Sequence, residues 1–249
     1  MRLEKLKPKE VKAYFEKNNT VIIPTGSIEC HGSHNALGVD FLVVEELVRI
    51  IDQKSDILIA TPIPYGATDG LAGYPGTISL GNALFEQLVM KVTDELYRHG
   101  ARKFVFLNGH GGNTAPINSV CIQLHKKGGL GAVLNWWTMS WELNSEWKGG
   151  HGGAQETSAM LAIDPSLVNM DDIEDECFVN DIEGFETVGF SAVCFEGVNI
   201  SMPRSIQALT HNGWVGNDHP KNATIQWGEE MLKANADYIC RFLEAFRKV

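Results

Sequence analysis

The segment TVIIPTGSIECH, from Thr20 to His31, joins an apolar run to a polar loop. Its first residues are mostly β-branched, which predicts a buried strand that ends at Thr25-Gly26. Similar apolar runs occupy residues 57–60, 103–107 and 132–134, and the last of these strands is expected to end in Asn135-Trp136-Trp137. Helical periodicity marks residues 9–17, 41–51, 83–99, 115–125 and 222–246. Strands that alternate with helices predict an α/β fold with a mostly parallel central sheet covered on both faces.

Two segments do not fit this simple alternation. Residues 62–81 form a long stretch rich in Gly, Pro, Thr and Ser, and loops of that length in compact domains usually carry function. Residues 171–205 have a weak, acidic pattern that is compatible with a hairpin, a lid or a subunit contact. The acidic run at residues 171–176 is expected to be a solvated surface.

Composition narrows the class of protein. The chain has 249 residues, of which 44% are hydrophobic and 21% charged, so we expect one globular domain over residues 1–249. A net charge of −10 argues against nucleic-acid and membrane partners. There is no apolar run long enough to span a bilayer and no signal-peptide pattern at the N-terminus. Five scattered cysteines without a CxxC pair favour reduced thiols and a cytoplasmic location.

The loop after the first predicted strand is rich in potential metal ligands. Glu29, His31, His34 and Asp40 lie within 12 residues of one another in the sequence. Glu29 and His31 are two positions apart, so in extended backbone their side chains point the same way. Carboxylate and imidazole together suit Zn²⁺, Mn²⁺ or Fe²⁺ better than Ca²⁺ or Mg²⁺. The alternative is a polar loop that happens to hold two histidines.

Two further clusters have the same character. His110 lies in the glycine-rich segment NGHGGN, residues 108–113, directly after the third predicted strand. His151 and Glu156 lie in GHGGAQETS, residues 150–158, where Glu156 is expected to open a helix. A tight turn with a surface histidine, and an ordinary acid in a first helical turn, are the respective alternatives. We expect all three clusters to follow strand ends, where ligands bind in such sheets.

Together these clusters contain enough ligands for two metal ions that share a bridging carboxylate. Such paired sites polarise a carbonyl and supply a metal-bound hydroxide near neutral pH. The ligand pool consists of Glu29, His31, Asp40, His110 and Glu156.

The set of motifs resembles the creatininase (creatinine amidohydrolase) family. The matching segments follow the family's order and are PTGSIECHG (24–32), Asp40, YPGTIS (74–79), NGHGGN (108–113) and HGGAQETS (151–158). The resemblance implies a three-layer α/β/α sandwich and a divalent-metal site that hydrolyses the C–N bond of an amide or cyclic amide. It also implies a homo-oligomer, often a hexamer.

The resemblance also assigns roles to individual residues, according to their positions in the matching motifs. It makes Glu29, His31, Asp40 and His110 metal ligands, with Asp40 as the bridge. Glu156 would complete the site as a ligand with a catalytic role, and His151 would shuttle a proton to the leaving nitrogen. The expected substrate-binding residues are Trp137, Trp147, Gly111, Gly112 and Thr77, and the two glycines would support the oxyanion through their N–H groups. The cofactor expected is one or two divalent ions per chain, Zn²⁺ being favoured over Mn²⁺ or Fe²⁺.

Two departures from the family pattern bear on the substrate. Cys30 stands where the family usually has Gln, and Gly112 stands where creatininases proper have a Glu. The NGHGGN form resembles other branches, which include a formamide deformylase and a peptidase-like maturation enzyme. We therefore predict hydrolysis of a small cyclic amide or related amide, with a formamide deformylase or a non-catalytic scaffold as alternatives. A hydrolase with Cys30 as nucleophile is a further alternative, although that side chain is expected to point away from the ligands.

Overall fold

A computed structural model describes residues 1–175, 182–216 and 218–249. Its centre is a four-stranded parallel sheet in the order β2-β1-β3-β4. The strands are β1 (Thr20–Thr25), β2 (Leu58–Ile59), β3 (Lys103–Asn108) and β4 (Leu130–Asn135). Thr25 pairs with Asn108 and Asn108 with Asn135, so the carboxyl ends of three strands lie level. The predicted parallel sheet is confirmed.

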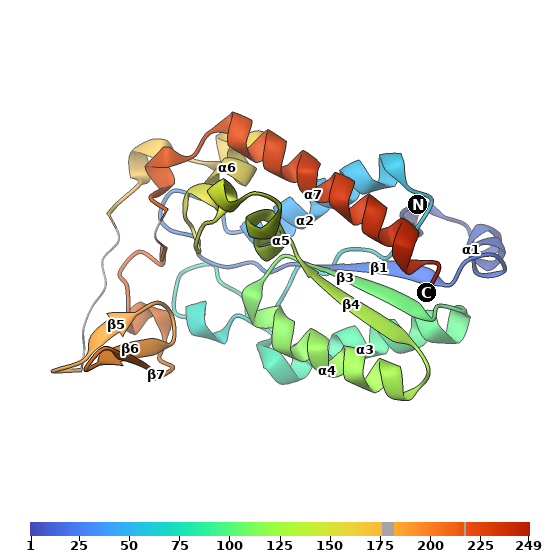
Figure 1. The fold of residues 1–249 in the computed structure, drawn as a ribbon, viewed down its shortest axis with the longest axis horizontal. Helices are drawn as coiled ribbons and strands as arrows, with labels where there is room; N and C mark the ends of the chain where they lie inside the picture. Colours follow the sequence, from blue (N-terminus) through green and yellow to red (C-terminus); the bar gives the residue numbers. More distant parts are fainter. Residues whose placement is uncertain (176–181, 217) are drawn as a thin grey trace.

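Helices cover both faces of this sheet, as Figure 1 shows. One face is covered by α2 (Val39–Lys54), α5 (Trp136–Leu143), α6 (Ala154–Ile163) and α7 (Ile225–Phe246). The other is covered by α3 (Gly81–His99) and α4 (Thr114–Lys126), with α1 (Pro8–Phe15) at its edge. Alternate strand residues serve the two cores, because Ile22 packs with α2 and α7 while Ile23 packs with α3 and α4. The three-layer sandwich is therefore also confirmed.

Two expectations about the segment after β4 were wrong. Trp136 and Trp137 do not end a strand but begin helix α5, directly after Asn135. Consequently the cluster that contains His151 does not follow a strand end: it follows α5 and a short 3-10 helix, Ser145–Trp147. The two adjacent tryptophans are equally apolar in the sequence, so they show no helical periodicity. In the structure Trp136 is fully buried, whereas Trp137 is only partly buried.

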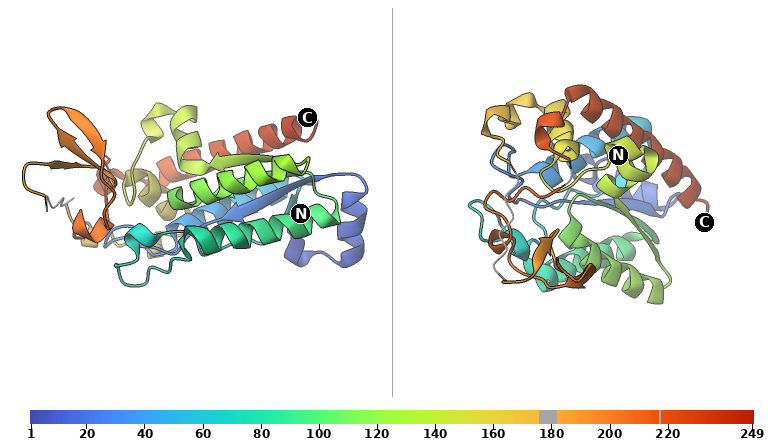
Figure 2. Two further views of the ribbon diagram at one scale, coloured as in Figure 1. Left: turned by 90° about the horizontal axis from the view of Figure 1, so that it is seen from below. Right: turned by 60° about the vertical axis from the view of Figure 1, so that its left-hand side comes forward.

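The weakly patterned segment forms a small antiparallel sheet that projects from the body (Figures 1 and 2). Its strands are β5 (Glu186–Val188), β6 (Ala192–Phe195) and β7 (Val198–Ser201). Asp171, Asp172 and Glu174 of the acidic run are exposed, as predicted, whereas Glu176 lies outside the described residues. Within the described ranges, no helix is both long and apolar enough to cross a membrane.

Close approach of α2 to the strand ends brings Asp40 to the sheet. A Cβ atom at Gly109, just after β3, would lie 2.1 Å from the backbone oxygen of Asp40. A Cβ atom at Gly26, just after β1, would lie 2.6 Å from the Cα atom of Phe41. Glycine at both positions therefore lets the first turn of α2 rest directly on the carboxyl ends of the strands.

Helix α6 depends on a similar contact with α7. A Cβ atom at Gly228 would lie 1.9 Å from the backbone oxygen of Ser158. We predict that Gly228→Ala lowers the free energy of unfolding by about 1–3 kcal/mol, although alanine is the better helix former. Urea denaturation measures the change, with Glu229→Ala on the exposed side of the same helix as control. Equal stability of the two variants would contradict the close contact.

Candidate metal centre

Side chains at the strand ends orient the loop that carries His110. The hydroxyl of Thr25 donates to Oδ1 of Asn108 at 3.1 Å. The amide nitrogen of Asn108 donates to Oδ1 of Asn135 at 2.9 Å and to the backbone oxygen of His110 at 2.7 Å. Strands β1, β3 and β4 are thus linked to one another and to the loop by buried or partly buried hydrogen bonds.

His31 and His110 each form a hydrogen bond from one ring nitrogen to a backbone oxygen. Nδ1 of His31 donates to the Glu29 carbonyl at 3.1 Å, and Nε2 of His110 donates to the Ala67 carbonyl at 3.0 Å. A carbonyl oxygen can only accept, so the proton of each neutral ring lies on that nitrogen. The opposite nitrogens, Nε2 of His31 and Nδ1 of His110, are then lone-pair donors that point into the site.

Carboxylate oxygens face both of these lone pairs. Nε2 of His31 lies 3.1 Å from Oδ1 of Asp40 and 3.5 Å from Oε2 of Glu156. Nδ1 of His110 lies 3.1 Å from Oδ2 of Asp40 and 3.1 Å from Oε1 of Glu29. Asp40 therefore contacts both histidines, His31 through Oδ1 and His110 through Oδ2.

The ligand atoms fit two divalent cations. Within each of the groups Glu29–Asp40–His110 and His31–Asp40–Glu156, the ligand atoms lie within 4.8 Å of one another. Oε1 of Glu29 and Oδ2 of Asp40 are buried without a hydrogen-bond donor among the described residues. Buried acceptors that converge without donors need a cation between them. Carboxylate and imidazole are the donor set of Zn²⁺, Mn²⁺ and Fe²⁺.

The close approach of these carboxylates and imidazoles also shifts the pKa values of the two histidines. Burial opposes the charged imidazolium, but the carboxylates of Asp40 and Glu156 outweigh it and raise the pKa of His31 to about 10. Glu29 and Asp40 likewise hold the pKa of His110 well above its usual value, again against burial. Both imidazoles therefore favour their protonated form beside these carboxylates.

His151 lies beside this group in a different electrostatic state. Its Nε2 donates to the Cys30 carbonyl at 2.7 Å, which leaves Nδ1 facing the site, 3.9 Å from Oε1 of Glu29. Its ring lies against that of His31, with centroids 4.2 Å apart and the ring planes tilted by 33°. Burial and the neighbouring His31 lower the pKa of His151 to about 4, so the ring is neutral and can accept a proton at Nδ1.

Glu156 belongs to the first turn of α6 and touches the loop that carries His151. Its Oε2 accepts a hydrogen bond from the backbone nitrogen of Gly152 at 2.6 Å. Burial raises the pKa of Glu156 to about 7, so this carboxyl can change its protonation state near neutrality.

A cavity of about 490 Å³ opens onto these residues. Its walls are mainly apolar: Trp137 and Trp141 come from α5, and Phe190 comes from the turn between β5 and β6. The remaining wall residues include Ala67, Thr68, Leu71, Gly111, Gly112, Gln155 and Ile206. Leu71, Phe190 and Ile206 were missed by sequence reasoning. Leu71 and Phe190 lie in the two segments that do not fit the strand–helix alternation, residues 62–81 and 171–205, and Ile206 directly follows the second.

Two predicted residues, Trp147 and Thr77, are placed differently from the expectation. Trp147 packs against the core beneath α5 and does not line the cavity. Thr77 also lies outside the lining, and its hydroxyl accepts a hydrogen bond from the Cys30 nitrogen at 3.1 Å. The Cys30 sulfur is directed to the backbone oxygen of Asn212 at 3.5 Å, so it turns away from the ligands as predicted.

Gly112 lies where a side chain has no room. A Cβ atom there would lie 2.1 Å from the Ala67 carbonyl oxygen and 2.5 Å from Nε2 of His110. The same carbonyl fixes the tautomer of His110. A glutamate at this position would therefore displace the residues 66–68 backbone that supports the His110 ring.

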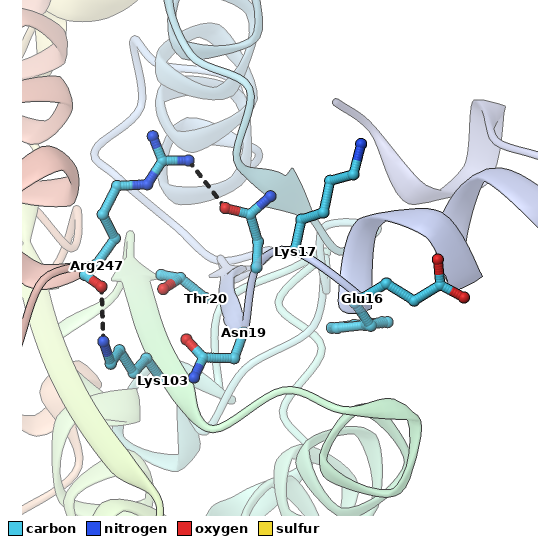
Figure 3. Close-up of a pocket in the computed structure, with 8 residues that line it drawn as sticks. Glu16, Lys17, Asn19, Thr20, Lys103 and Arg247 are labelled. Atoms are coloured by element: carbon cyan, nitrogen blue, oxygen red, sulfur yellow. Dashed lines mark hydrogen bonds between the residues drawn. The ribbon is translucent and has the colours of Figure 1, made fainter.

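A second cavity, of about 450 Å³, lies at the opposite ends of the strands (Figure 3). Lys103 there donates to the Arg247 carbonyl at 2.7 Å. The Arg247 guanidinium is shared among Asn18, Asp56 and Glu244. The lining contains no histidine and one carboxylate, Glu16, so it lacks the combination of imidazole and carboxylate ligands found at the first cavity.

Metal binding to this site should release protons. A divalent ion must displace the protons that His31 and His110 hold below their raised pKa values, so affinity should increase as pH rises towards about 10. We predict that calorimetric titration with Mn²⁺ near pH 7 gives different enthalpies in Tris and in PIPES, corresponding to about one proton released per ion. Identical enthalpies in the two buffers would show that the histidines are not displaced.

Comparison with known proteins identifies the family. The family model described as creatininase, creatinine amidohydrolase, matches residues 4–243. Creatinine amidohydrolase of Pseudomonas putida is 31% identical over 190 residues, which cover 67% of this chain and 73% of the relative. The mycofactocin precursor peptide peptidase of Mycolicibacterium smegmatis is 28% identical over 232 residues, with 89% and 85% covered.

Solved structures agree with this result. A manganese creatininase superposes with a TM-score of 0.76 at 25% identity and covers 98% of both chains. Creatininase has also been solved in a zinc–zinc form, with a TM-score of 0.74 at 25% identity over 98% of both chains. Members of the family are metal-dependent amidohydrolases, and the His, Glu and Asp cluster described above is able to bind divalent metal. The chain belongs to the creatininase family of metal-dependent hydrolases.

Proposed function

We propose that this chain hydrolyses the C–N bond of a small cyclic amide or related amide, with the help of divalent ions that Asp40 and the neighbouring histidines and glutamates would hold. The observation that carries the proposal is the sharing of Asp40 between two histidine nitrogens whose lone pairs point inward. Glu29 and His110 would hold one ion, and His31 and Glu156 the other.

The ions would supply Lewis acidity to the amide carbonyl and lower the pKa of a nearby water. The chain's own residues supply position and proton transfer. Nδ1 of His151 faces the site and is unprotonated near neutral pH, so it can take a proton and return it to the leaving nitrogen. Gly111 and Gly112 line the cavity beside His110, where their N–H groups would stabilise developing negative charge on oxygen.

The cavity favours a small, flat and uncharged substrate. Its volume of about 490 Å³ lies in the range of small-molecule sites. No lysine or arginine lines it among the described residues, so apart from the proposed metal ions it offers no cationic side chain to a phosphate or carboxylate. Trp137 and Trp141 provide faces for stacking, and Gln155 fixes Trp141 by accepting its indole N–H at 2.9 Å.

Two substrate classes share these properties. Cyclic amides are favoured by the aromatic walls, and formamides are favoured by the absence of any side chain at Gly112, where creatininases proper carry a carboxylate. A panel of creatinine, hydantoin and N-substituted formamides separates them. We further propose that the chain acts in the cytoplasm as a homo-oligomer, which the reduced-thiol pattern and the family resemblance support.

Removal of the shared carboxylate tests the metal centre. We predict that wild-type protein contains about two transition-metal ions per chain and that Asp40→Asn loses both ions and its hydrolase activity, because that side chain contacts both groups. Inductively coupled plasma mass spectrometry measures the content. Asp237→Asn, an exposed acid paired with Lys54, is the matched control. Full metal content in Asp40→Asn would refute the shared-ligand arrangement.

Replacement of His151 separates proton transfer from metal binding. We predict that His151→Gln retains its metal but loses about 10²–10⁴-fold in kcat, the usual contribution of a positioned acid–base group. Steady-state kinetics on the best substrate of the panel measures the loss, with exposed His99→Gln as control. A kcat within about twofold of wild type would remove His151 from the mechanism.

A further inference from the structure

Asp218 lies outside the proposed metal site, yet the loop that carries His151 is folded around its carboxylate. Its Oδ1 accepts a hydrogen bond from the Gly150 nitrogen at 2.7 Å, and its Oδ2 accepts one from the Gln155 nitrogen at 3.0 Å. Its backbone oxygen accepts from the Ala154 nitrogen at 3.2 Å. These donors lie immediately before His151 and at the start of α6.

Glycines surround this carboxylate because no larger residue fits. A Cβ atom at Gly149 or at Gly153 would lie 2.4 Å from a carboxylate oxygen of Asp218, and one at Gly216 would lie 2.7 Å away. Contact with Asp218 thus explains Gly149 and Gly153, whereas Gly150 packs against the backbone of Val215 and Gly216, and Gly152 against that of His31. Burial raises the pKa of the Asp218 carboxyl, whereas the bonds from Gln155 and Gly150 oppose that rise.

The bonded segment holds two residues of the proposed mechanism. Between the donors at Gly150 and Gln155 lies His151, whose backbone oxygen accepts from the Val215 nitrogen at 2.9 Å. Directly after Gln155 lies Glu156, whose carboxylate contacts Nε2 of His31. The other group of ligands, formed by β1, α2 and the loop after β3, receives no hydrogen bond from Asp218 among the described residues.

We propose that Asp218 is a positioning residue that sets Glu156 and His151 against the shared ligand Asp40. This inference rests on the proposed function, because it assigns Asp218 to only one half of the metal site. The carboxylate acts at the N-terminus of α6, where it satisfies backbone donors that the helix itself leaves free. Loss of the carboxylate frees residues 149–155 to move and takes Glu156 with them.

The proposal predicts an asymmetric effect on metal binding. Wild-type protein titrated with Mn²⁺ binds two ions, and Asp218→Asn and Asp218→Ala bind the first ion as wild type does. The second ion binds about 10–100-fold more weakly, the usual effect of removing an outer-shell partner. Hydrogen-exchange mass spectrometry detects faster exchange over residues 149–156 in both variants.

Two controls separate positioning from stability. Asp164→Asn removes an exposed carboxylate at the other end of α6, where it accepts from Ser166 at 2.9 Å. Val120→Ala destabilises the core on the opposite face of the sheet without touching either ligand group. Neither control should change the ratio of the two Mn²⁺ affinities, even where the melting temperature falls.

Several outcomes would overturn the inference. Unchanged affinities and unchanged exchange in the Asp218 variants would show that the carboxylate positions nothing. If the Asp218 variants bound both ions more weakly to the same extent, and Val120→Ala of similar stability did the same, the role of Asp218 would be merely structural. Absence of any bound Mn²⁺ in wild-type protein would instead refute the proposed function, and the exchange of residues 149–156 would then decide whether Asp218 holds the loop.

Discussion

The carboxylate of Asp40 is the interaction on which the rest of the site depends. It lies in the first turn of α2, buried against the strand ends, with one oxygen towards His31 and the other towards His110. A buried carboxylate between two imidazoles is costly unless positive charge compensates it. Protons on His31 and His110 can supply that charge, and divalent ions would supply it in the working protein.

The architecture makes this arrangement possible. Parallel strands bring their carboxyl ends to one edge, so loops far apart in sequence meet there. Glycines at positions 26 and 109 let α2 descend onto that edge. Backbone oxygens of Glu29 and Ala67 then fix the ring tautomers, so Nε2 of His31 and Nδ1 of His110 face the site.

Sequence reasoning reached the parts of the molecule that have strong local signals. The β-branched run before Thr25 and the apolar face of residues 83–99 predicted their elements within a few residues. The candidate ligands were noticed because histidines and acids beside glycines are unusual. Sequence reasoning failed for α5, because its tryptophans give no clear helical periodicity. It also missed Phe190, which reaches the cavity only through the tertiary fold. Asp218 carries no local signal, since its partners are backbone groups about 65 residues away in sequence.

Anomalous diffraction from metal-loaded crystals tests the central claim most directly. Data collected on either side of the manganese absorption edge locate each ion independently of its ligands. The account predicts two peaks on opposite sides of Asp40, about 3.5–4 Å apart, each within coordination distance of one of its oxygens. A single peak, or a peak that Asp40 does not contact, would contradict the shared-carboxylate arrangement.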